Sequence, residues 1–429
     1  MGEPGAQSIK VDTRGNFYYL FNAINHAKKN GYRPANMMQT NKTYDALIIG
    51  AGPSGMNTAR LLALRGMSVA VLERKNQIGD NIVCTGIVGE DIFSRFQIPS
   101  DSVINKIQKV NLFSPLDMKL SYFHPVPFAY VLDRKQFDLS LSREAAQKGA
   151  VIRTGFDVKD INISSRNVSV TGTMKQGQEK KVNGRILVLA TGNNFRLHKR
   201  LKLGQPREFL NAVQAELLTD EAGNTEVWVG KNVAPGGFVW SVPLDKTRVR
   251  TGLFTKAFPV PYLNQFIKKR FPQAAEKSGN LEIRSKTIAQ GVVSPTYGHR
   301  VLSVGEAAAQ VKTTTGGGIY YGLLCSEIAA DVLIHNAADD RFSAADLADY
   351  EKRWRKIIHK ELTVGFYTRK ICSRLKDREV ERLFQIARDD GVFPLIKDMA
   401  RFDWQKDVIL ALAKKATVRS IQALPQLFS

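Results

Sequence analysis

The chain has 429 residues, of which 43% are hydrophobic, and it carries only three cysteines. At about 100–200 residues per domain, this length predicts two or three domains with apolar cores, and the many aromatic and branched side chains exclude a disordered chain. Three widely spaced cysteines exclude a disulfide framework, and also a zinc site or iron–sulfur cluster with four cysteine ligands. We therefore expect no metal centre and a reducing, cytoplasmic location.

The balance of charge is strongly basic. The sequence has 62 Lys and Arg against 40 Asp and Glu, a net charge of +22, and both ends are more densely basic than the middle. Such a balance suits binding to nucleic acid or to an anionic membrane surface, or it reflects only a basic proteome. No zinc-finger, RNA-binding or helix–turn–helix motif accompanies it, so no nucleic-acid partner is expected. No run of about 20 apolar residues occurs, so no membrane-spanning helix is predicted.

Residues 1–42 form an N-terminal extension without the layout of a secretory signal. Apolar residues at helical spacing predict a short amphipathic helix that ends at Gly31. These residues are Phe17, Leu20, Phe21 and Ile24. The helix could pack on the main domain or touch a membrane, and the sequence leaves both possibilities open.

The first chemical signal is a strand–turn–helix–strand unit. Apolar runs predict buried strands over 44–49 and 68–72, with a helix over 56–65 between them. The turn that joins the first strand to the helix reads Gly50-Ala51-Gly52-Pro53-Ser54-Gly55. This order of elements is typical of a Rossmann dinucleotide site.

Each residue of this turn has a physical role in such a site. Gly50 allows the tight turn, Gly52 lets the backbone approach a pyrophosphate, and Gly55 permits close packing of helix on strand. The start of the helix offers unpaired N–H groups to the phosphates. Glu73 is placed to accept hydrogen bonds from a ribose, and it disfavours NADP by repelling a 2′-phosphate, although Arg74 leaves some room for one.

A second glycine-rich turn selects FAD. A strand is predicted over 300–304, followed by Gly305-Glu306, and Thr315-Gly316-Gly317-Gly318-Ile319 opens an apolar helix through about Leu333. An acidic residue after a strand can hold a ribityl hydroxyl. The helix start can aim N–H groups at the pyrimidine edge of a flavin, where negative charge collects on reduction. Two such turns, some 265 residues apart, suit one long cofactor.

These stretches resemble the geranylgeranyl reductase family of FAD-dependent oxidoreductases, which has a p-hydroxybenzoate hydroxylase-like fold. The resemblance runs along roughly 43–370. Beside the two glycine-rich turns with Glu73, it is carried by Val83-Cys84-Thr85-Gly86, Leu132-Asp133-Arg134 with Phe137-Asp138, and Gly237-Phe238-Val239-Trp240-Ser241-Val242-Pro243.

The resemblance implies a set of FAD contacts. Ser54 would face the pyrophosphate, Val158 would contact adenine through its backbone, and the loop at Cys84 would pass beside the isoalloxazine. Glu306 stands where the family usually has Asp. The expected FAD-binding residues are Gly50, Gly52, Ser54, Gly55, Glu73, Arg74, Cys84, Thr85, Gly86, Arg134, Val158, Gly305, Glu306, Gly317, Gly318 and Ile319.

The chain departs from the family pattern at two motifs, and the second departure concerns the substrate surface. Where the family has Cys-Gly-Gly, this chain has Cys84-Thr85-Gly86. Where the family has Tyr-x-Trp-x-Phe-Pro, this chain has Phe-Val-Trp-Ser-Val-Pro at 238–243. The expected substrate-contacting residues are Phe238, Trp240 and Pro243, although Trp240 could equally pack inside a sheet. The change in this surface weakens the case for any particular prenyl lipid.

The function implied by the resemblance is saturation of C=C bonds in an isoprenoid chain of a lipid or quinone by hydride from reduced FAD. An acid must protonate the second carbon, and Cys84 and Tyr320 are the candidates. Electrons would come from NAD(P)H, a ferredoxin or a reduced quinone. Two alternatives stay open. One is a flavin monooxygenase or halogenase, whose Trp-x-Trp-x-Ile-Pro pattern lacks its first Trp here, and the other is a membrane-docking electron-transfer flavoprotein.

The C-terminal region 341–429 predicts helices over 344–356, 361–374, 378–386 and from 405 through 415 onwards. The last has an apolar face opposite a basic one, which suits either packing on a domain or peripheral contact with an anionic membrane. The apolar residues are Val408, Ile409, Leu412, Ala416 and Ile421, and the basic ones are Lys406, Lys414, Lys415 and Arg419.

The predicted fold is therefore α/β, with a Rossmann-type FAD-binding domain, an inserted antiparallel-sheet substrate domain and a C-terminal helical tail. A sheet inserted between two parts of the FAD domain explains the distance between the glycine-rich turns. The FAD domain is expected from 43–95, 130–205 and 285–340, and the substrate sheet from 96–129 and 206–284.

Overall fold

The computed structural model describes residues 10–11, 17–18, 42–98, 100–175, 177–277, 281–389 and 401–423. The chain divides into two compact units, Met1–Met37 and Met38–Ser429. In the first unit, strand β1 (Lys10–Val11) pairs antiparallel with β2 (Phe17–Tyr18). The prediction of a helix at Phe17 is therefore wrong, because this residue lies in a strand. Leu20, Phe21, Ile24 and Gly31 lie outside the described residues.

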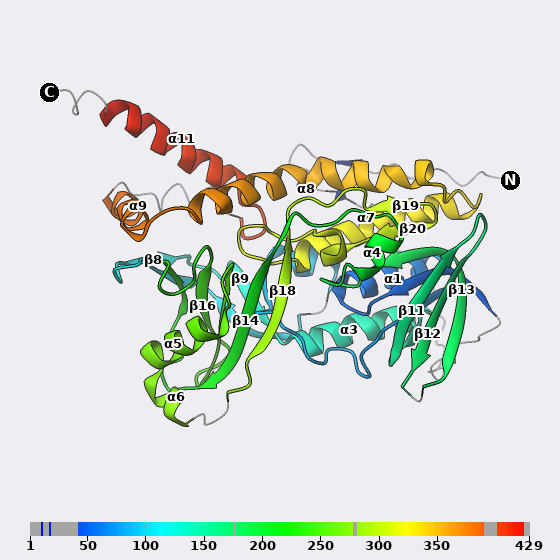
Figure 1. The fold of residues 1–429 in the computed structure, drawn as a ribbon, viewed down its shortest axis with the longest axis horizontal. Coiled ribbons are helices and arrows are strands. Elements are labelled where there is room, and N and C mark those ends of the chain that lie inside the picture. The colour runs from blue at the N-terminus through cyan, green and yellow to red at the C-terminus, as the bar shows by residue number, and fades with distance from the viewer. Residues whose placement is uncertain are drawn as a thin grey trace. The chain divides into compact units, whose positions relative to one another are not determined.

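The second unit contains an eight-stranded sheet, with the main order β10-β4-β3-β13-β12-β11 and with β20 and β19 beside β13 (Figure 1). Parallel pairing joins β10, β4, β3, β13 and β20, while β11, β12 and β13 pair antiparallel. The bounds are β3 Thr43–Ile49, β4 Val69–Leu72, β10 Val151–Arg153, β11 Phe156–Ile163, β12 Val168–Met174, β13 Glu179–Leu189, β19 Tyr297–Gly298 and β20 Val301–Ser303. Because both faces of its parallel strands are covered, these strands read as continuous apolar runs.

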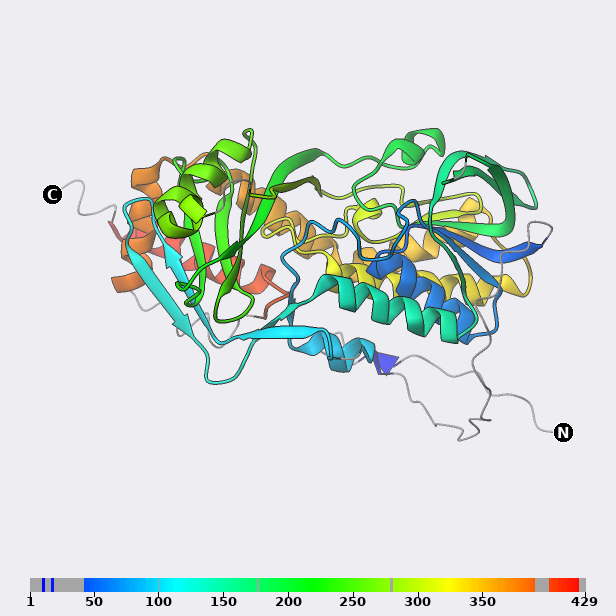
Figure 2. The ribbon, with the colours of Figure 1, turned by 90° about the horizontal axis from the view of Figure 1, so that it is seen from below.

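Helices α1 (Pro53–Leu64), α3 (Arg134–Gln147) and α7 (Ile319–Ala337) share one hydrophobic core with a face of this sheet. Figure 2 shows α1 and α3 side by side. Asn57 of α1 donates a hydrogen bond of 2.7 Å to the hydroxyl of Ser326 on α7, so α1 and α7 are also neighbours. Helix α1 begins earlier than predicted because Pro53 fits the first helical position.

Helix α8 (Ala344–Cys372) is one continuous helix where two had been predicted over 344–356 and 361–374. A capping box between Ser343 and Asp346 starts it. The four residues between the predicted helices contain no Gly or Pro, so nothing interrupts the helix there. Helices α9 (Asp377–Asp389) and α11 (Lys406–Ala423) follow, as the spacing predicted.

The second large sheet has seven strands in the order β18-β14-β17-β16-β15-β7-β8. All neighbours pair antiparallel except β7 and β15, which are parallel. Its strands are β7 Lys109–Phe113, β8 Lys119–Phe123, β14 Glu208–Leu218, β15 Thr225–Val229, β16 Phe238–Pro243, β17 Arg248–Thr255 and β18 Arg284–Gln290. The predicted FAD segment that starts at 285 thus begins inside a strand of this sheet.

One face of the seven-stranded sheet is covered by α5 (Val260–Arg270) and α6 (Pro272–Lys277), and Phe238 and Trp240 lie in apolar clusters separate from that core. A third sheet pairs β5 (Ile87–Gly89), β9 (Ala129–Leu132) and β6 (Val103–Ile107). The shorter helices are α2 (Asp91–Phe96), α4 (Arg196–Arg200) and the 3-10 turn η1 (Gly305–Ala308).

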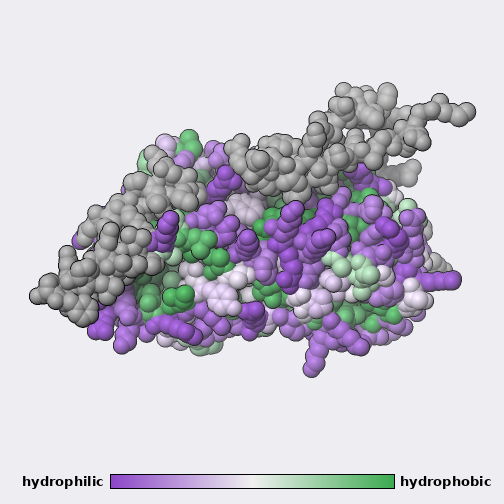
Figure 3. Space-filling model, turned by 90° about the horizontal axis from the view of Figure 1, so that it is seen from above, coloured by the Kyte–Doolittle hydropathy of each residue, from purple (hydrophilic) through white to green (hydrophobic). Residues whose placement is uncertain are grey.

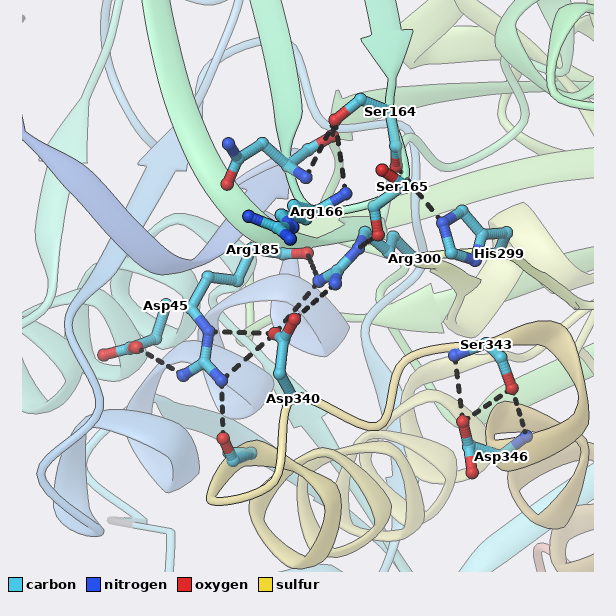
Figure 4. A network of polar contacts seen from close by, with 12 residues as sticks. Asp45, Ser164, Ser165, Arg166, Arg185, His299, Arg300, Asp340, Ser343 and Asp346 are labelled. Atoms are coloured by element: carbon cyan, nitrogen blue, oxygen red, sulfur yellow. Dashed lines mark hydrogen bonds and ion pairs between the residues drawn. The ribbon is translucent and has the colours of Figure 1, made fainter.

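A charged network fixes the amino-terminal edge of the parallel strands (Figure 4). Asp340, in the connection between α7 and α8, accepts hydrogen bonds of 3.1 Å from both Arg185 and Arg300. Arg185 also binds Asp45 of β3 at 3.1 Å. The hydrogen bond and charge of Arg300, together with those of Arg185, outweigh the effect of burial and hold the pKa of Asp340 below its usual range. This edge lies opposite the carboxyl ends of the strands, where α/β sheets bind ligands.

His198, in α4, should make the stability of the protein fall in mild acid. The imidazole is fully buried, and burial lowers its pKa to about 4. A depressed pKa contributes stability that is complete above the unfolded value near 6.5 and is lost as the pH falls towards 4. At pH 5 the expected loss is about 2 kcal/mol. Urea denaturation at pH 8 and pH 5 should show that His198→Leu lacks this loss. The variant of an exposed histidine, His335→Leu, should keep it, and equal losses in all three proteins would contradict the assignment.

Candidate functional site

The first glycine-rich turn lies at the carboxyl end of β3, against the start of α1. Gly50 has a φ of 108°, and a Cβ there would lie 2.3 Å from the carbonyl oxygen of Ala190. A Cβ on Gly55 would lie 2.1 Å from the carbonyl oxygen of Gly50. A Cβ on Gly52 would meet no atom within 4 Å. The fold therefore needs Gly50 and Gly55, whereas at Gly52 it leaves open space at an uncapped helix start.

Glu73 holds this turn from the end of β4. Its carboxylate accepts hydrogen bonds of 2.8 Å from the backbone N–H groups of Ala51 and Lys75. Each oxygen keeps a further lone pair with which it can bind a ribose. Arg74 is exposed, and Val158 is buried in β11, with its carbonyl accepting a hydrogen bond of 3.2 Å from Arg196. The roles of these residues towards a cofactor stay predictions.

Ser54 brings the two distant glycine-rich segments together. A Cβ on Gly305 would lie 2.2 Å from the Ser54 hydroxyl, and one on Gly322 would lie 2.3 Å from it. Ser54 belongs to the first turn, Gly305 follows β20 and Gly322 lies in the first turn of α7. The hydroxyl thus occupies a space that only glycines leave, and the two turns separated in sequence meet at one place.

Glu306 forms an ion pair that no local sequence pattern predicts. Lys286 of β18 donates a hydrogen bond of 2.8 Å to its Oε2. The other oxygen, Oε1, is buried and has no hydrogen-bond partner among the described residues. An unpaired buried carboxylate oxygen costs free energy, so it is a natural acceptor for a hydroxyl of a bound molecule.

The second turn leads into α7. Gly316 has a φ of 76°, and Gly318 is the residue before the helix, which no side chain caps. A Cβ on Gly317 would lie 2.9 Å from Cε of Lys312, and one on Gly318 would lie 2.6 Å from Val311. The N–H groups at the start of α7 are thus available to a polar edge of a ligand.

The loop at Cys84 lies against the start of α3. The N–H of Leu132 donates a hydrogen bond of 2.9 Å to the carbonyl of Gly86, and a Cβ on Gly86 would lie 3.3 Å from Cγ of Arg134. Asp138 binds Arg134 at 3.0 Å. Burial lowers the pKa of Arg134, but Asp138 and the adjacent Cys84 outweigh it and raise that pKa above its usual value. The resemblance motifs around Cys84 and Arg134 are therefore in contact.

Arg250 connects this loop to the seven-stranded sheet. Its guanidinium donates a hydrogen bond of 2.7 Å to the carbonyl of Thr85, and it binds Glu216 at 2.8 Å. Trp240 pairs with Gly252 and Val242 with Arg250, so the side chains of Trp240 and Arg250 share one face of the sheet. That face is therefore the one that meets the Cys84 loop.

The expected substrate residues differ in their surroundings. Phe238 and Trp240 are half-buried, with ring centroids 6.0 Å apart, and the indole N–H has no hydrogen-bond partner among the described residues. Pro243 is buried, and its carbonyl accepts a hydrogen bond of 2.8 Å from Asn105. A separate cavity of about 600 Å³ between β15 and α5 contains none of the expected site residues in its lining.

Tyr320 lies deeper than Cys84. Its ring contacts Phe96 and Trp404 with centroids 5.3 and 6.0 Å away. Burial, and then the charge and hydrogen bond of Asp91, raise the pKa of its phenol. Cys84 is only half-buried. The structure thus gathers Cys84, Thr85, Gly86 and Arg134 in one group and the two glycine-rich turns in another.

Sequence reasoning missed three charged residues, Lys286, Arg250 and Asp403, because their partners are far away in the chain. Asp138 was already part of the motif that carries the resemblance, and its place four residues after Arg134 on a helix could also have predicted that the two residues pair. Among the described residues, no cluster of His, Cys, Asp and Glu could hold a metal ion.

The fold and these turns define a class, the FAD-dependent oxidoreductases with a Rossmann-type cofactor domain. The open space at Gly52, the two uncapped helix starts and the unpaired oxygen of Glu306 fit FAD. A family model described as tryptophan halogenase matches residues 97–368, and one described as an NAD(P)-binding Rossmann-like domain matches residues 48–87. The first match covers more than half of the chain, which therefore belongs to the tryptophan halogenase family.

The similar proteins identify the type of enzyme. Digeranylgeranylglycerophospholipid reductase 2 of Methanothermobacter thermautotrophicus is 29% identical over 358 residues, which cover 80% of this chain and 91% of the relative. The structure of a geranylgeranyl bacteriochlorophyll reductase-like protein from Thermoplasma acidophilum has a TM-score of 0.77 at 19% identity and covers 90% of this chain and 99% of that one. A flavin-dependent brominase has a TM-score of 0.63 at 17% identity, with 88% and 100% covered. The predicted fold class and the FAD-dependent oxidoreductase of geranylgeranyl reductase type are thereby confirmed.

Proposed function

We propose that the enzyme saturates the C=C bonds of an isoprenoid chain carried by a membrane lipid or a quinone. The observation that carries this proposal is the apolar sheet face of Phe238 and Trp240, which Arg250 joins to the Cys84 loop. An isoprenoid chain offers no polar group, so an apolar wall is the surface that suits it. The reductase activity of the similar proteins supports the same substrate class.

Bound and reduced, FAD supplies a hydride to one carbon of the double bond. The residues of the chain must then hold the alkene, exclude water and deliver a proton to the other carbon. We favour Cys84 over Tyr320 as the acid, because the phenol of Tyr320 is buried among aromatic rings and bound to Asp91, whereas Cys84 is partly accessible. The electron donor is NAD(P)H or a ferredoxin in this proposal.

The decisive experiment is anaerobic. Chemically reduced enzyme is incubated with a geranylgeranyl lipid, and the mass of the lipid is then measured by mass spectrometry. We expect a gain of one H₂ for each double bond reduced. Cys84→Ser should lower the single-turnover rate at least tenfold, while Tyr320→Phe should change it little. An unchanged lipid in the presence of bound, reduced FAD would overturn the proposal.

A halogenase or monooxygenase is the second candidate, because the family model that matches is named after a halogenase. The chain has Phe238 where the halogenase pattern expects the first Trp. Such an enzyme needs oxygen, so consumption of oxygen coupled to NAD(P)H oxidation, with no anaerobic turnover, would favour it over the reductase.

We also propose that the C-terminal helices touch an anionic membrane. Among the described residues, no helix is long and apolar enough to span a membrane. Large apolar side chains are nevertheless exposed on α8, α9 and α11, and the sequences of α8 and α11 hold more basic than acidic residues, whereas α9 holds three basic and four acidic ones. On the face in Figure 3, hydrophilic side chains predominate and hydrophobic ones form separate patches. The exposed apolar residues on these helices are Tyr367, Ile371, Leu383, Ile386 and Leu410.

Replacing Leu383 and Ile386 by serine should weaken flotation with anionic liposomes several-fold, because both lose their apolar burial in the lipid interface. Phe258, which is 71% exposed and lies outside these helices, provides the matched control Phe258→Ser. Binding should also fall with added salt. Absence of flotation, or flotation that does not depend on lipid charge, salt and these substitutions, would rule out contact of these helices with an anionic membrane.

A further inference from the structure

A buried ion pair lies directly behind the second glycine-rich turn. Nζ of Lys312 is 2.8 Å from Oδ1 of Asp403, and the two side chains are only 6% and 4% exposed. The ammonium also donates a hydrogen bond of 3.2 Å to the carbonyl of Phe402 and lies 4.0 Å from the centroid of its ring. A buried charge of this kind is stable only while its partner is present.

Lys312 is part of the turn itself. Its N–H donates a hydrogen bond of 2.8 Å to the carbonyl of Gly317, and its carbonyl accepts one of 2.7 Å from Gly316. The space where Gly317 would carry a Cβ is closed by Cε of the lysine at 2.9 Å. The position of the lysine side chain therefore determines the shape of the turn that leads into α7.

Asp403 comes from the other end of the chain, in the segment 402–406 that leads into α11. Several contacts fix this segment. The phenol of Tyr321 donates a hydrogen bond of 2.7 Å to the carbonyl of Asp403, and Thr314 donates one to Gln405. Glu361 of α8 accepts hydrogen bonds of 3.0 and 2.9 Å from the N–H groups of Gln405 and Lys406. The segment is thus attached to the turn, to α7 and to α8.

We propose that segment 402–406 is a structural part of the flavin site, with Asp403 positioning Lys312 and, through it, the turn Gly316–Gly318. The inference rests on the proposed FAD site at this turn. Lys312 and Asp403 are positioning residues. Removing either partner leaves an uncompensated buried charge next to the turn, whereas exchanging both for apolar side chains removes the charge altogether.

The test compares Lys312→Met, Asp403→Leu and the double variant. The dissociation constant of FAD is measured by titrating each apoprotein and following flavin fluorescence. Thermal denaturation checks that each apoprotein is folded. Each single substitution should weaken FAD binding at least tenfold, and the double variant should recover to within about threefold of the unmodified protein. The conservative Lys312→Arg should retain most of the affinity.

A second readout separates this role from general stability. The midpoint potential of bound FAD should fall in Lys312→Met, which removes a positive charge, and rise in Asp403→Asn, which removes a negative one. Glu327, on α7 and away from the turn, forms an ion pair of 2.7 Å with Arg95. Glu327→Gln should therefore lower thermal stability without changing the affinity for FAD or its midpoint potential. If the unmodified protein binds FAD but the single variants bind it equally well, the inference fails while the flavoprotein assignment stands. If the unmodified protein does not bind FAD, the proposed site fails first.

Discussion

Replacing Gly52 by valine should remove FAD from the protein while leaving the apoprotein folded. A Cβ at Gly52 would meet no atom beyond its chain neighbours within 4 Å, and the backbone there is extended, so we expect the fold to tolerate the substitution. The side chain enters the space at the start of α1 through which the pyrophosphate must approach. We expect a loss of FAD affinity of at least a hundredfold, measured by fluorescence titration, with an apoprotein melting temperature close to that of the unmodified protein.

Gly55→Val is the informative comparison, because a Cβ at Gly55 would lie 2.1 Å from the carbonyl oxygen of Gly50. That variant should lose both FAD and thermal stability. Retention of the normal flavin content in Gly52→Val would show that the pyrophosphate does not approach at this turn.

Replacing Asp138 by alanine should cause the largest loss of stability. The side chain of Arg134 is only 11% exposed, and Asp138 is the carboxylate that binds it, at 3.0 Å. Burial raises the pKa of Asp138, while the charge and hydrogen bonds of Arg134 pull it down. Loss of the carboxylate leaves a guanidinium in the interior without its counter-charge, which costs about 3–5 kcal/mol. Urea denaturation of the apoprotein measures this cost.

Asp349→Ala provides the control, since Asp349 also forms an ion pair with an arginine four residues away but is 54% exposed. Removing such a surface pair should cost less than about 1 kcal/mol. If Asp138→Ala costs no more than Asp349→Ala, the guanidinium of Arg134 must find water or another partner.

The sequence predicted those parts of the structure that depend on residues close together in the chain. The unit from 44 to 73 was predictable, because strand, turn and helix have separate local signals within thirty residues. The split of the C-terminal helix at 357–360 was wrong, since helices end where a breaker stops them and none is present. The place of β18 in the seven-stranded sheet and the parallel pairing of β7 with β15 depend on partners far away, which no local pattern shows.

The same reason explains what was missed in the candidate site. Lys286, Arg250 and Asp403 are ordinary charged residues in their local sequence. Each acquires its position from a partner at least twenty residues away: Glu306, Thr85 and Lys312. Glu73 and Glu306 were found because each follows directly on a buried strand, whereas a lysine in the middle of an edge strand resembles solvent-facing surface.

The meeting of Ser54 with Gly305 and Gly322 also bears on how the protein is made. A ribosome delivers the first glycine-rich turn early, but its neighbours arrive only after about three quarters of the chain has been synthesised. Contacts of such long sequence separation form slowly, and domains with many of them pass through intermediates that expose apolar surface. We therefore expect cofactor capture to be a late event in biosynthesis, because the two turns that would hold FAD meet only after residues 305–322 have been synthesised.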